Sequence, residues 1–465
     1  MRPVSGGVPI EPDAAGMRAL ADEVVRFVCE HLATLAEQPA SDVEGALAVA
    51  AGFREAAPER GRALAEVLER LRPAIGASYN TAGPGYLAYI PGGGLFTAGL
   101  AGWIGDAVNR YTGVRQAAPA LVQIEETTLG WLAAEMGYPA GAGGVLTSGG
   151  SLANLIAIVT ARERHLGDDL AGGVLYASAE VHHSVTKAAK LAGLPEAALR
   201  VVPVDERRRM RPEALEAAIR ADRAAGRRPF LVVASAGTTN TGAIDPLQDV
   251  AVIAQRHGLW LHADAAYGGF FRLAPQAAER LRGLERCDSI TLDPHKGLFL
   301  PYGTGCVLVR DREALRRAHR SGADYMQDLG DDTGFAELSP ELSRRFRGLL
   351  LWLPIQLHGL AAFREQLAEK LELARHAAQR LRADGGFELL DEPQLSVVAF
   401  RLRGGDDAAN AELLRRVVAR KRVFLSSTRL EGRYCLRLCV LSFRTHRERV
   451  EEALEALVEE ARALS

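Results

Sequence analysis

Apolar side chains recur every three or four residues near the start of the chain, from Ala14 to about Glu37. This spacing places them on one face of a helix. The residues that carry the pattern are Met17, Leu20, Val24, Val28, Leu32 and Leu35. Asp13 precedes them as a candidate N-cap. A second helix is predicted from Pro58 to about Leu71, with proline in its first turn. Both patterns hold too few apolar residues for a core, so we expect them to pack elsewhere, for example on a partner subunit.

After a Gly- and Pro-rich stretch at 81–94, short apolar runs alternate with helical patterns. The predicted strands are Val145–Thr147, Gly173–Ala177, Phe230–Ala234, Leu259–Ala263, Ser289–Leu292 and Gly305–Val309. The predicted helices among them are Leu152–Arg162, Ser184–Leu191 and Val250–His257. Apolar strands that alternate with helices are typical of an α/β fold whose mostly parallel sheet is covered on both faces.

A long helical pattern from about Trp352 to Arg382 opens the last part of the chain. The segments Ser396–Leu402 and Tyr434–Leu438 then alternate with helices, and Arg447–Leu464 ends the pattern. We therefore predict a smaller α+β domain. The expected organisation is an N-terminal helical segment at 1–83, a large domain at 84–352 and a small C-terminal domain at 353–465.

Composition narrows the kind of protein. A chain of 465 residues with 48% hydrophobic and 25% charged residues is typical of a globular protein with several domains. A net charge of −2 gives no electrostatic reason to expect nucleic acid or an anionic membrane as partner. The most apolar stretch, Leu349–Phe363, is interrupted by Pro354, Gln356 and His358 and is too short to span a bilayer. Since the N-terminus also lacks a signal-peptide pattern, we expect a cytoplasmic protein.

The five cysteines are scattered, and their odd number does not suggest a disulfide framework. They are Cys29, Cys287, Cys306, Cys435 and Cys439. The last two have no Cys or His neighbours at the spacing of metal ligands. We expect buried thiols in a reducing compartment and no metal site.

Three segments carry candidate chemistry at the ends of predicted strands. Lys296 follows the strand Ser289–Leu292 and an Asp-Pro turn, at the edge where open α/β sheets bind ligands. A lysine that is partly desolvated there can form an imine, although alone it could be a surface residue. Asp264 ends the strand Leu259–Ala263, and a carboxylate there could keep the ring nitrogen of a pyridine cofactor protonated. Alone, Asp264 could equally belong to a turn or a cap.

The loop Ser148-Gly149-Gly150-Ser151 opens a helix, so its backbone N–H groups, the helix N-terminus and the Ser151 hydroxyl could hold a phosphate. An ordinary glycine turn is the alternative. His182 or His183 could stack on a cofactor ring, or could simply cap a helix. The loop that contains Thr238 and Thr239 could reach the phenolic oxygen of the same cofactor ring, or could be an ordinary polar loop. Taken together and in this order, the segments indicate pyridoxal 5′-phosphate (PLP) held as a Schiff base on Lys296.

These segments resemble the group II PLP-dependent amino-acid decarboxylases, which include aromatic-L-amino-acid decarboxylase and glutamate decarboxylase. The resemblance covers nearly the whole chain after the first helices. The residues that carry it are Asp293–Lys296, His262–Tyr267, His182 with Ser184 and Val185, Pro84–Pro91, Arg344–Arg347 with Trp352, and Leu395–Leu402.

The resemblance implies a fold-type-I, aspartate-aminotransferase-like enzyme that forms a homodimer with active sites at the subunit interface. The implied cofactor-binding residues are Gly149, Gly150, Ser151, His182, Thr239, Asp264, Ala266, His295 and Lys296. By the same resemblance Lys296 would hold PLP, Asp264 would pair with its ring nitrogen, and Ala266 and His182 would flank the ring. Tyr325 matches a catalytic tyrosine that the family carries on a mobile loop.

Some positions depart from the family. Asp293 stands where an asparagine is usual, which brings a carboxylate nearer the phosphate. Tyr89 matches an aromatic residue of the substrate pocket, but Ile90 and Gly113 fall where other rings are expected. The match at Tyr89 favours an aromatic substrate.

The predicted activity is α-decarboxylation of an L-amino acid, with Tyr325 or His182 as the acid that protonates Cα. An aldehyde synthase or an aminotransferase on the same scaffold is the close alternative, with Arg437 as a carboxylate site in the aminotransferase. A non-catalytic α/β module that binds nucleotides or proteins is the alternative of another class. Against it, the loop Ser148–Ser151 lacks both the G-x-G-x-x-G spacing and the Walker lysine.

Overall fold

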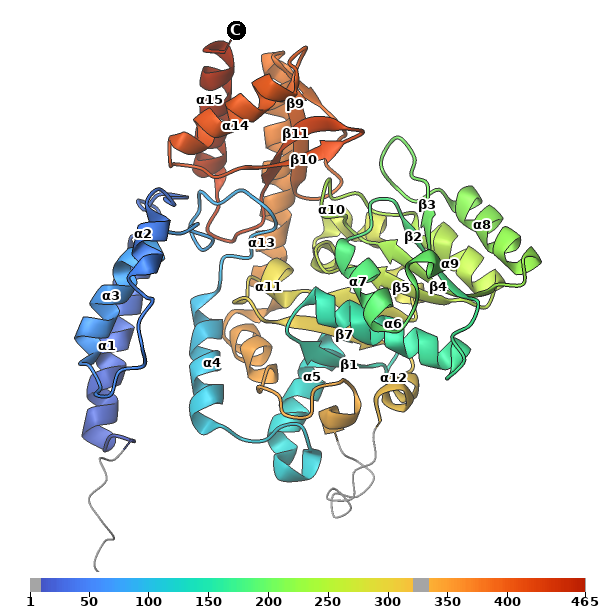
Figure 1. Ribbon diagram of the computed structural model, residues 1–465, viewed down its shortest axis with the longest axis horizontal. Coiled ribbons are helices and arrows are strands. Elements are labelled where there is room, and N and C mark those ends of the chain that lie inside the picture. Colours follow the sequence, from blue (N-terminus) through green and yellow to red (C-terminus); the bar gives the residue numbers. More distant parts are fainter. Residues whose placement is uncertain (1–9, 321–333, 465) are drawn as a thin grey trace, which may run out of the picture.

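The computed structural model describes residues 10–320 and 334–464 of the chain. Figure 1 shows a large α/β part, a smaller C-terminal part and a group of N-terminal helices beside them. Among the described residues, no helix is long and apolar enough to cross a membrane.

The large part is built on a seven-stranded sheet in the order β1-β7-β6-β5-β4-β2-β3. Its strands are β1 Gly143–Thr147, β2 Gly173–Ser178, β3 Leu199–Val202, β4 Arg228–Ser235, β5 Trp260–Asp264, β6 Ser289–Leu292 and β7 Gly305–Val309. The pairs from β6 to β3 are parallel, whereas β7 runs antiparallel to both β6 and β1. Every residue of β2, β5, β6 and β7 is buried. The predicted mostly parallel sheet is confirmed.

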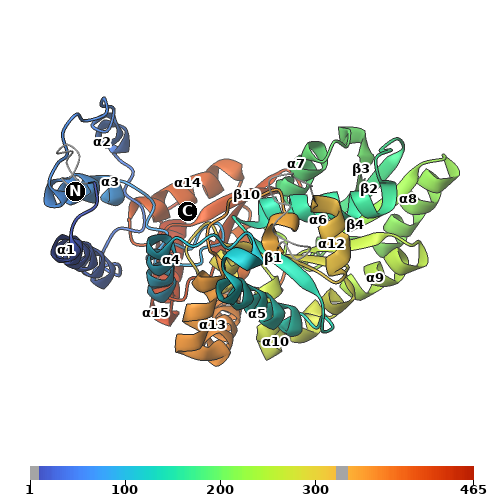
Figure 2. The ribbon, with the colours of Figure 1, turned by 90° about the horizontal axis from the view of Figure 1, so that it is seen from below.

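Helices cover both faces of this sheet, with α6 on one face and α9 on the other (Figure 2). The helices of this part are α4 Phe96–Val108, α5 Pro119–Glu135, α6 Gly150–Leu166, α7 His183–Leu191, α8 Pro212–Ala224, α9 Leu247–Arg256, α10 Pro275–Ala278, α11 Pro294–Gly297 and α12 Arg312–His319. Because the strands are apolar on both sides, both layers are needed to exclude water from the sheet.

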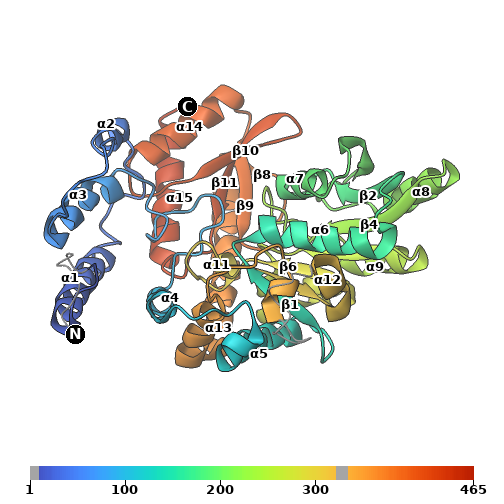
Figure 3. The same ribbon diagram turned by 60° about the horizontal axis from the view of Figure 1, so that its bottom comes forward.

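The small part is a four-stranded antiparallel sheet in the order β10-β11-β9-β8. Its elements are β8 Phe387–Leu389, β9 Val397–Leu402, α14 Asp407–Ala419, β10 Ser426–Leu430, β11 Arg433–Cys439 and α15 Arg447–Arg462. Its buried core is closed by α14, α15 and the end of the long helix α13, Gly348–Asp384. The helix α13 is broken at Gly359, where φ is 70° and ψ is 157°, and the predicted domain boundary at 352/353 lies before this break. In Figure 3, α13 leads from the large part into the small one.

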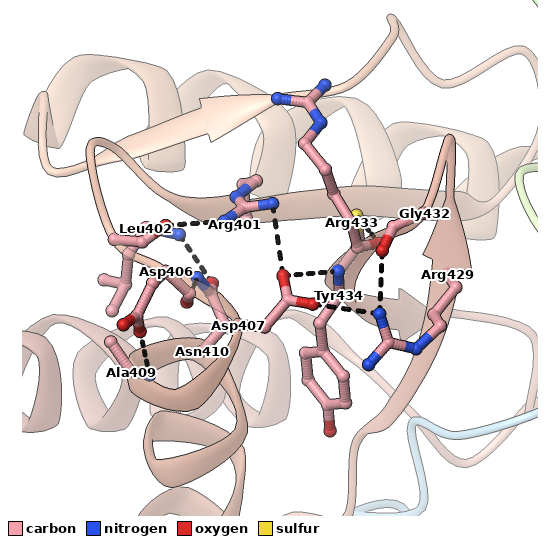
Figure 4. Close-up of polar contacts among 12 residues, drawn as sticks. Arg401, Leu402, Asp406, Asp407, Ala409, Asn410, Arg429, Gly432, Arg433 and Tyr434 are labelled. Carbon is pink, nitrogen blue, oxygen red and sulfur yellow. Dashed lines mark hydrogen bonds and ion pairs between the residues drawn. The ribbon is translucent and has the colours of Figure 1, made fainter.

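A polar cluster fixes the turn between β9 and α14 (Figure 4). Asp406 caps α14 by accepting a hydrogen bond of 2.8 Å from the Ala409 N–H. The Asp407 carboxylate accepts 2.9 Å bonds from the Tyr434 N–H and from the Arg429 guanidinium. The fully buried Asn410 amide accepts from the Leu402 N–H and donates to the Asp406 carbonyl. The cluster therefore ties α14 to β9 and to the β10–β11 hairpin.

The N-terminal helices α1 Ala14–Ala33, α2 Ala46–Ala51 and α3 Leu64–Gly76 lie apart from the large sheet (Figures 1 and 2). None of them has a buried residue. The predicted N-cap is confirmed, because Asp13 accepts a hydrogen bond of 2.8 Å from the Gly16 N–H.

Two predictions for this region are wrong. The second long helix begins at Leu64 rather than Pro58, because the polar stretch before it contains Gly61 and has no apolar face to bury. Cys29 is exposed, unlike the other four thiols, because its helix buries no side chain in the single chain.

Candidate active site

A cavity of about 280 Å³ lies at the carboxyl ends of the parallel strands, and it gathers the predicted cofactor residues. Its lining includes Gly149, Gly150, Ser151, His182, Thr239, Asp264, Ala266, His295 and Lys296. These come from loops that follow β1, β2, β4, β5 and β6, since parallel strands end at one edge of the sheet. Their individual roles stay predictions.

Two predicted residues are not part of this lining. Tyr89 lies on a loop, is 54% exposed and has a positive φ of 56°. Tyr325 lies outside the described residues.

The loop before α6 is shaped by two glycines. Gly149 has φ of 155°, a conformation that side-chain-bearing residues rarely adopt. A Cβ atom on Gly150 would come within 3.0 Å of Asp293 Oδ2 and 3.2 Å of the Ala266 Cβ. The first N–H groups of a helix lack acceptors within the helix, so this open loop offers donors and space to an anion.

Lys296 forms an ion pair with Asp293, with 2.8 Å between Nζ and Oδ2. The Asp293 side chain is 3% exposed, and its Oδ1 has no hydrogen-bond partner among the described residues. His295 Nε2 lies 3.6 Å from the same carboxylate, while its Nδ1 bonds to the Thr304 carbonyl at 2.7 Å. Burial lowers the pKa of His295. Asp293, which stands where the family usually has asparagine, therefore contacts the amine of Lys296, the predicted anchor of the cofactor.

Asp264 ends β5 and is 8% exposed. Its Oδ2 accepts a hydrogen bond of 3.0 Å from the Asn154 amide, and its Oδ1 accepts one of 3.3 Å from the Ala266 N–H. Both donors are neutral, so the carboxylate has no cation bonded to it among the described residues. A ring N–H brought into the cavity would be a suitable partner.

His182 caps α7, and its Nδ1 lies 2.7 Å from the Ser184 hydroxyl. Burial lowers its pKa, while the charge of Asp264 acts in the opposite direction. The ring of His182 is therefore held in its neutral form near neutral pH.

Sequence reasoning missed Asn154, whose amide bonds to Asp264, to Ser184 and to His262. The residue is 1% exposed and lies on the apolar face of α6. A lone amide in an otherwise apolar helix face is the signal that was available, because buried amides need hydrogen-bond partners.

Arg437 on β11 holds the threonine loop and is 3% exposed. Its guanidinium donates to the Thr239 carbonyl, to the Asn240 carbonyl at 2.8 Å and to the Ser426 hydroxyl at 3.2 Å. Because its guanidinium already makes these hydrogen bonds, Arg437 is not free to bind a substrate carboxylate. The aminotransferase alternative therefore loses its proposed carboxylate site.

The cavity fits PLP in its chemistry. The open glycine loop suits a phosphate, the Lys296 amine suits an aldehyde, and Asp264 suits a protonated ring nitrogen.

Comparison with known proteins agrees with this geometry. Residues 48–403 match the family described as the pyridoxal-dependent decarboxylase conserved domain. The aromatic-L-amino-acid decarboxylase of Bacillus atrophaeus is 34% identical over 466 residues, which cover 97% of each protein. The cysteine sulfinic acid decarboxylase of Homo sapiens is 35% identical over 73% of this chain and 71% of its own length. The crystal structure of Oryza sativa TDC with PLP and tryptamine has a TM-score of 0.92 at 28% identity, covering 98% of this chain and 99% of that one.

Proposed function

The chain belongs to the pyridoxal-dependent decarboxylase family, and on that premise we propose that it converts an aromatic L-amino acid to its amine and CO2. It is a PLP-dependent amino-acid decarboxylase. The observation that carries the proposal is the single cavity that brings the Lys296 amine, the Asp264 carboxylate and the glycine loop of α6 together.

PLP, when bound, would supply an aldehyde that reacts with amines and a protonated ring that accepts the electron pair left on Cα when CO2 departs. Lys296 would provide the amine that holds the cofactor. The Asp264 carboxylate would accept the ring N–H and keep that proton in place. The first turn of α6 would bind the phosphate, and His182 and Ala266 would flank the ring.

The cavity favours a substrate with a neutral side chain. Its described lining contains no arginine, so a second carboxylate on the substrate would lack a bidentate partner there. Arg437, which could have served, is engaged by backbone carbonyls. One similar protein is named aromatic-L-amino-acid decarboxylase, and one similar crystal structure contains TDC with PLP and tryptamine. Both support an aromatic substrate. We propose that Tyr89 contacts this substrate.

The test is product analysis with the PLP-loaded enzyme. Incubation with pooled L-amino acids, followed by mass spectrometry, should show amines from aromatic members and none from glutamate or cysteine sulfinate. Borohydride reduction should attach a pyridoxyl group to the peptide that contains Lys296. Label on another lysine, or amine from acidic substrates only, would contradict the proposal.

Product identity also separates decarboxylation from aldehyde synthesis. We propose that Tyr325 donates the proton to Cα, with His182 as the alternative donor. Tyr325→Phe keeps the ring but removes the acidic hydroxyl, so the variant should release less amine and more aldehyde. Amine formation at the wild-type rate would assign the proton to His182 instead.

We also propose a homodimer in which the N-terminal helices pack on the partner. Their exposed large apolar residues are Met17, Leu20, Val24 and Val25 on α1, Leu47 on α2, and Val67, Leu71 and Ile75 on α3. So many exposed apolar side chains on neighbouring helices support a contact with another protein. Light scattering should give the mass of a dimer, and a fully active monomer would refute the proposal.

A further inference from the structure

A continuous series of hydrogen bonds leads from the core of the large domain to the cavity. Its members, in order, are Trp260, Ser289, His262, Asn154, Ser184 and His182. The first five are at most 5% exposed. Water therefore does not compete for these bonds, and each donor must match an acceptor. We refer to the six residues as the His182 network.

The indole Nε1 of Trp260 is only a donor, so the Ser289 hydroxyl accepts from it at 2.8 Å. That hydroxyl keeps its own proton and a second lone pair, and it lies 2.8 Å from Nδ1 of His262. This end therefore allows either tautomer of His262, and the bonds of Asn154 decide between them.

The Asp264 carboxylate, which only accepts hydrogen bonds, sets the direction of the network at Asn154. His262 Nε2 donates to the Asn154 amide oxygen at 3.0 Å, whereas the Thr291 hydroxyl is farther from that nitrogen at 3.4 Å. The reverse amide orientation would place its oxygen against the Asp264 carboxylate, which is also an acceptor. The NH2 group must therefore donate, to Asp264 Oδ2 at 3.0 Å and to the Ser184 hydroxyl at 2.9 Å.

The last bond defines the tautomer of His182. The Ser184 backbone N–H donates to His182 Nδ1 at 3.3 Å, so this nitrogen is an acceptor. Ser184 Oγ, which accepts from Asn154, can therefore donate its own proton to the same nitrogen, 2.7 Å away. We propose that the His182 network fixes His182 as the tautomer protonated on Nε2, so that this cavity-lining ring is a hydrogen-bond donor to the substrate, with Asn154 as the positioning residue.

The electrostatics agree with a neutral ring. Burial lowers the pKa of His182, and the other charged or titratable groups that act on it are Asp264, Asp293, Lys296 and His183. Burial also lowers the pKa of His262, to about 4. Since both rings are neutral near pH 7, each has one proton whose place the network decides.

The use of His182 as a donor to the substrate rests on the proposed function, but the tautomer can be measured without turnover. Nitrogen-15 NMR of histidine-labelled holoenzyme distinguishes protonated from bare ring nitrogens. His182→Gln and His262→Gln assign the two signals. Both rings should be bare on Nδ1 and protonated on Nε2 at pH 7. A proton on Nδ1 of His182, or a charged His182 ring at pH 7, would overturn the inference.

Asn154→Asp keeps the shape of the side chain but replaces its NH2 donor with a carboxylate oxygen. The introduced oxygen would face Asp264 Oδ2, so the two carboxylates should share one proton. The Ser184 hydroxyl would lose its Asn154 donor and would then donate to the introduced oxygen, so His182 should lose its single tautomer. Asn410→Asp is the matched control, since Asn410 is also fully buried and uses both ends of its amide. It should leave both histidine signals unchanged.

Ser184→Ala provides a second variant should Asn154→Asp fail to fold. It removes the O–H donor and keeps the longer backbone N–H contact of 3.3 Å, so the second tautomer of His182 should become populated while His262 keeps one. Unchanged His182 signals in Ser184→Ala would show that the backbone N–H, and not the network, fixes this tautomer. Absence of amine from every aromatic amino acid would refute the proposed function alone, because the tautomers are read without substrate.

Discussion

Asp264 in the large domain and Asp407 in the small domain are both bonded to a backbone N–H, yet their surroundings differ. Asp407 also bonds to the Arg429 guanidinium and lies 3.8 Å from that of Arg401 (Figure 4). The Tyr434 N–H, with help from Arg429, lowers the pKa of Asp407. Asp264 has only neutral donors, from Asn154 and Ala266.

The difference separates a structural carboxylate from a functional one. The charge of Asp407 is compensated by neighbours on its own domain, so its cluster is complete without a ligand. The charge of Asp264 is buried and faces a cavity, where it is available to a cationic group of the cofactor. Residue type alone does not distinguish the two; the presence of a neighbouring cation does.

Replacing each aspartate by the isosteric asparagine tests this distinction most strongly. Asp264→Asn should lower the turnover number by about two to three orders of magnitude, because an amide does not hold a proton on the cofactor ring. Asp407→Asn, the matched control, should keep turnover within about twofold of the wild type. Amine release is measured at saturating PLP, with cofactor content checked by absorbance. Near wild-type turnover of Asp264→Asn would remove the proposed role.

As the pH falls, protonation of His262 in the network behind Asp264 should destabilise the protein before protonation of Asp407 in the small-domain cluster does. Burial lowers the pKa of His262 from 6.5 to about 4 in the folded protein, so the unfolded chain binds the proton first as pH falls. The free energy of unfolding should therefore decrease between pH 6.5 and about 4, with a contribution from His262 on the order of 3 kcal/mol.

Urea unfolding of the wild type and of His262→Gln at several pH values measures this contribution. The variant should lose less stability than the wild type over the same interval. An equal loss in both proteins would show that His262 is not the group responsible.

The smallest effect is expected for Asp407→Ala, which removes the carboxylate that joins α14 to the hairpin. Because the site is partly exposed, the thermal midpoint should fall by about 2 °C or less. Differential scanning fluorimetry detects such a change, and the rate of amine formation should stay unchanged. A tenfold loss of rate would mean that the cluster supports the active site after all.

The sequence was sufficient for six of the seven strands of the large sheet, because each contains a short apolar run between turns. The predicted strand Ser289–Leu292 and the predicted strand Gly305–Val309 coincide with β6 and β7. The edge strand β3 was missed, since it is four residues long, contains Arg200 and leaves Val201 64% exposed. A short strand of this kind is defined by its pairing with the neighbouring strand β2, which the local sequence pattern does not reveal.

For the site, the chain order of glycine loop, histidine, threonine loop, aspartate and lysine predicted which residues line one cavity. It did not predict the contact between Lys296 and Asp293 or the bonds of Asn154, because these depend on side-chain directions after folding. Arg437 was a carboxylate site only in the aminotransferase alternative, whereas it binds the threonine loop nearly two hundred positions earlier. The roles of Tyr89 and Tyr325, the homodimer and the cytoplasmic location stay predictions.

The bond between Arg437 and the threonine loop also has a consequence for the order of events during synthesis. The ribosome releases the large domain first, and domains generally fold as they emerge. Thr239 is then already in place, but its carbonyl lacks the guanidinium on β11 until some 198 further residues have been made. The nascent chain therefore lacks this support of the threonine loop until translation is almost finished, although every residue that lines the cavity has by then been made.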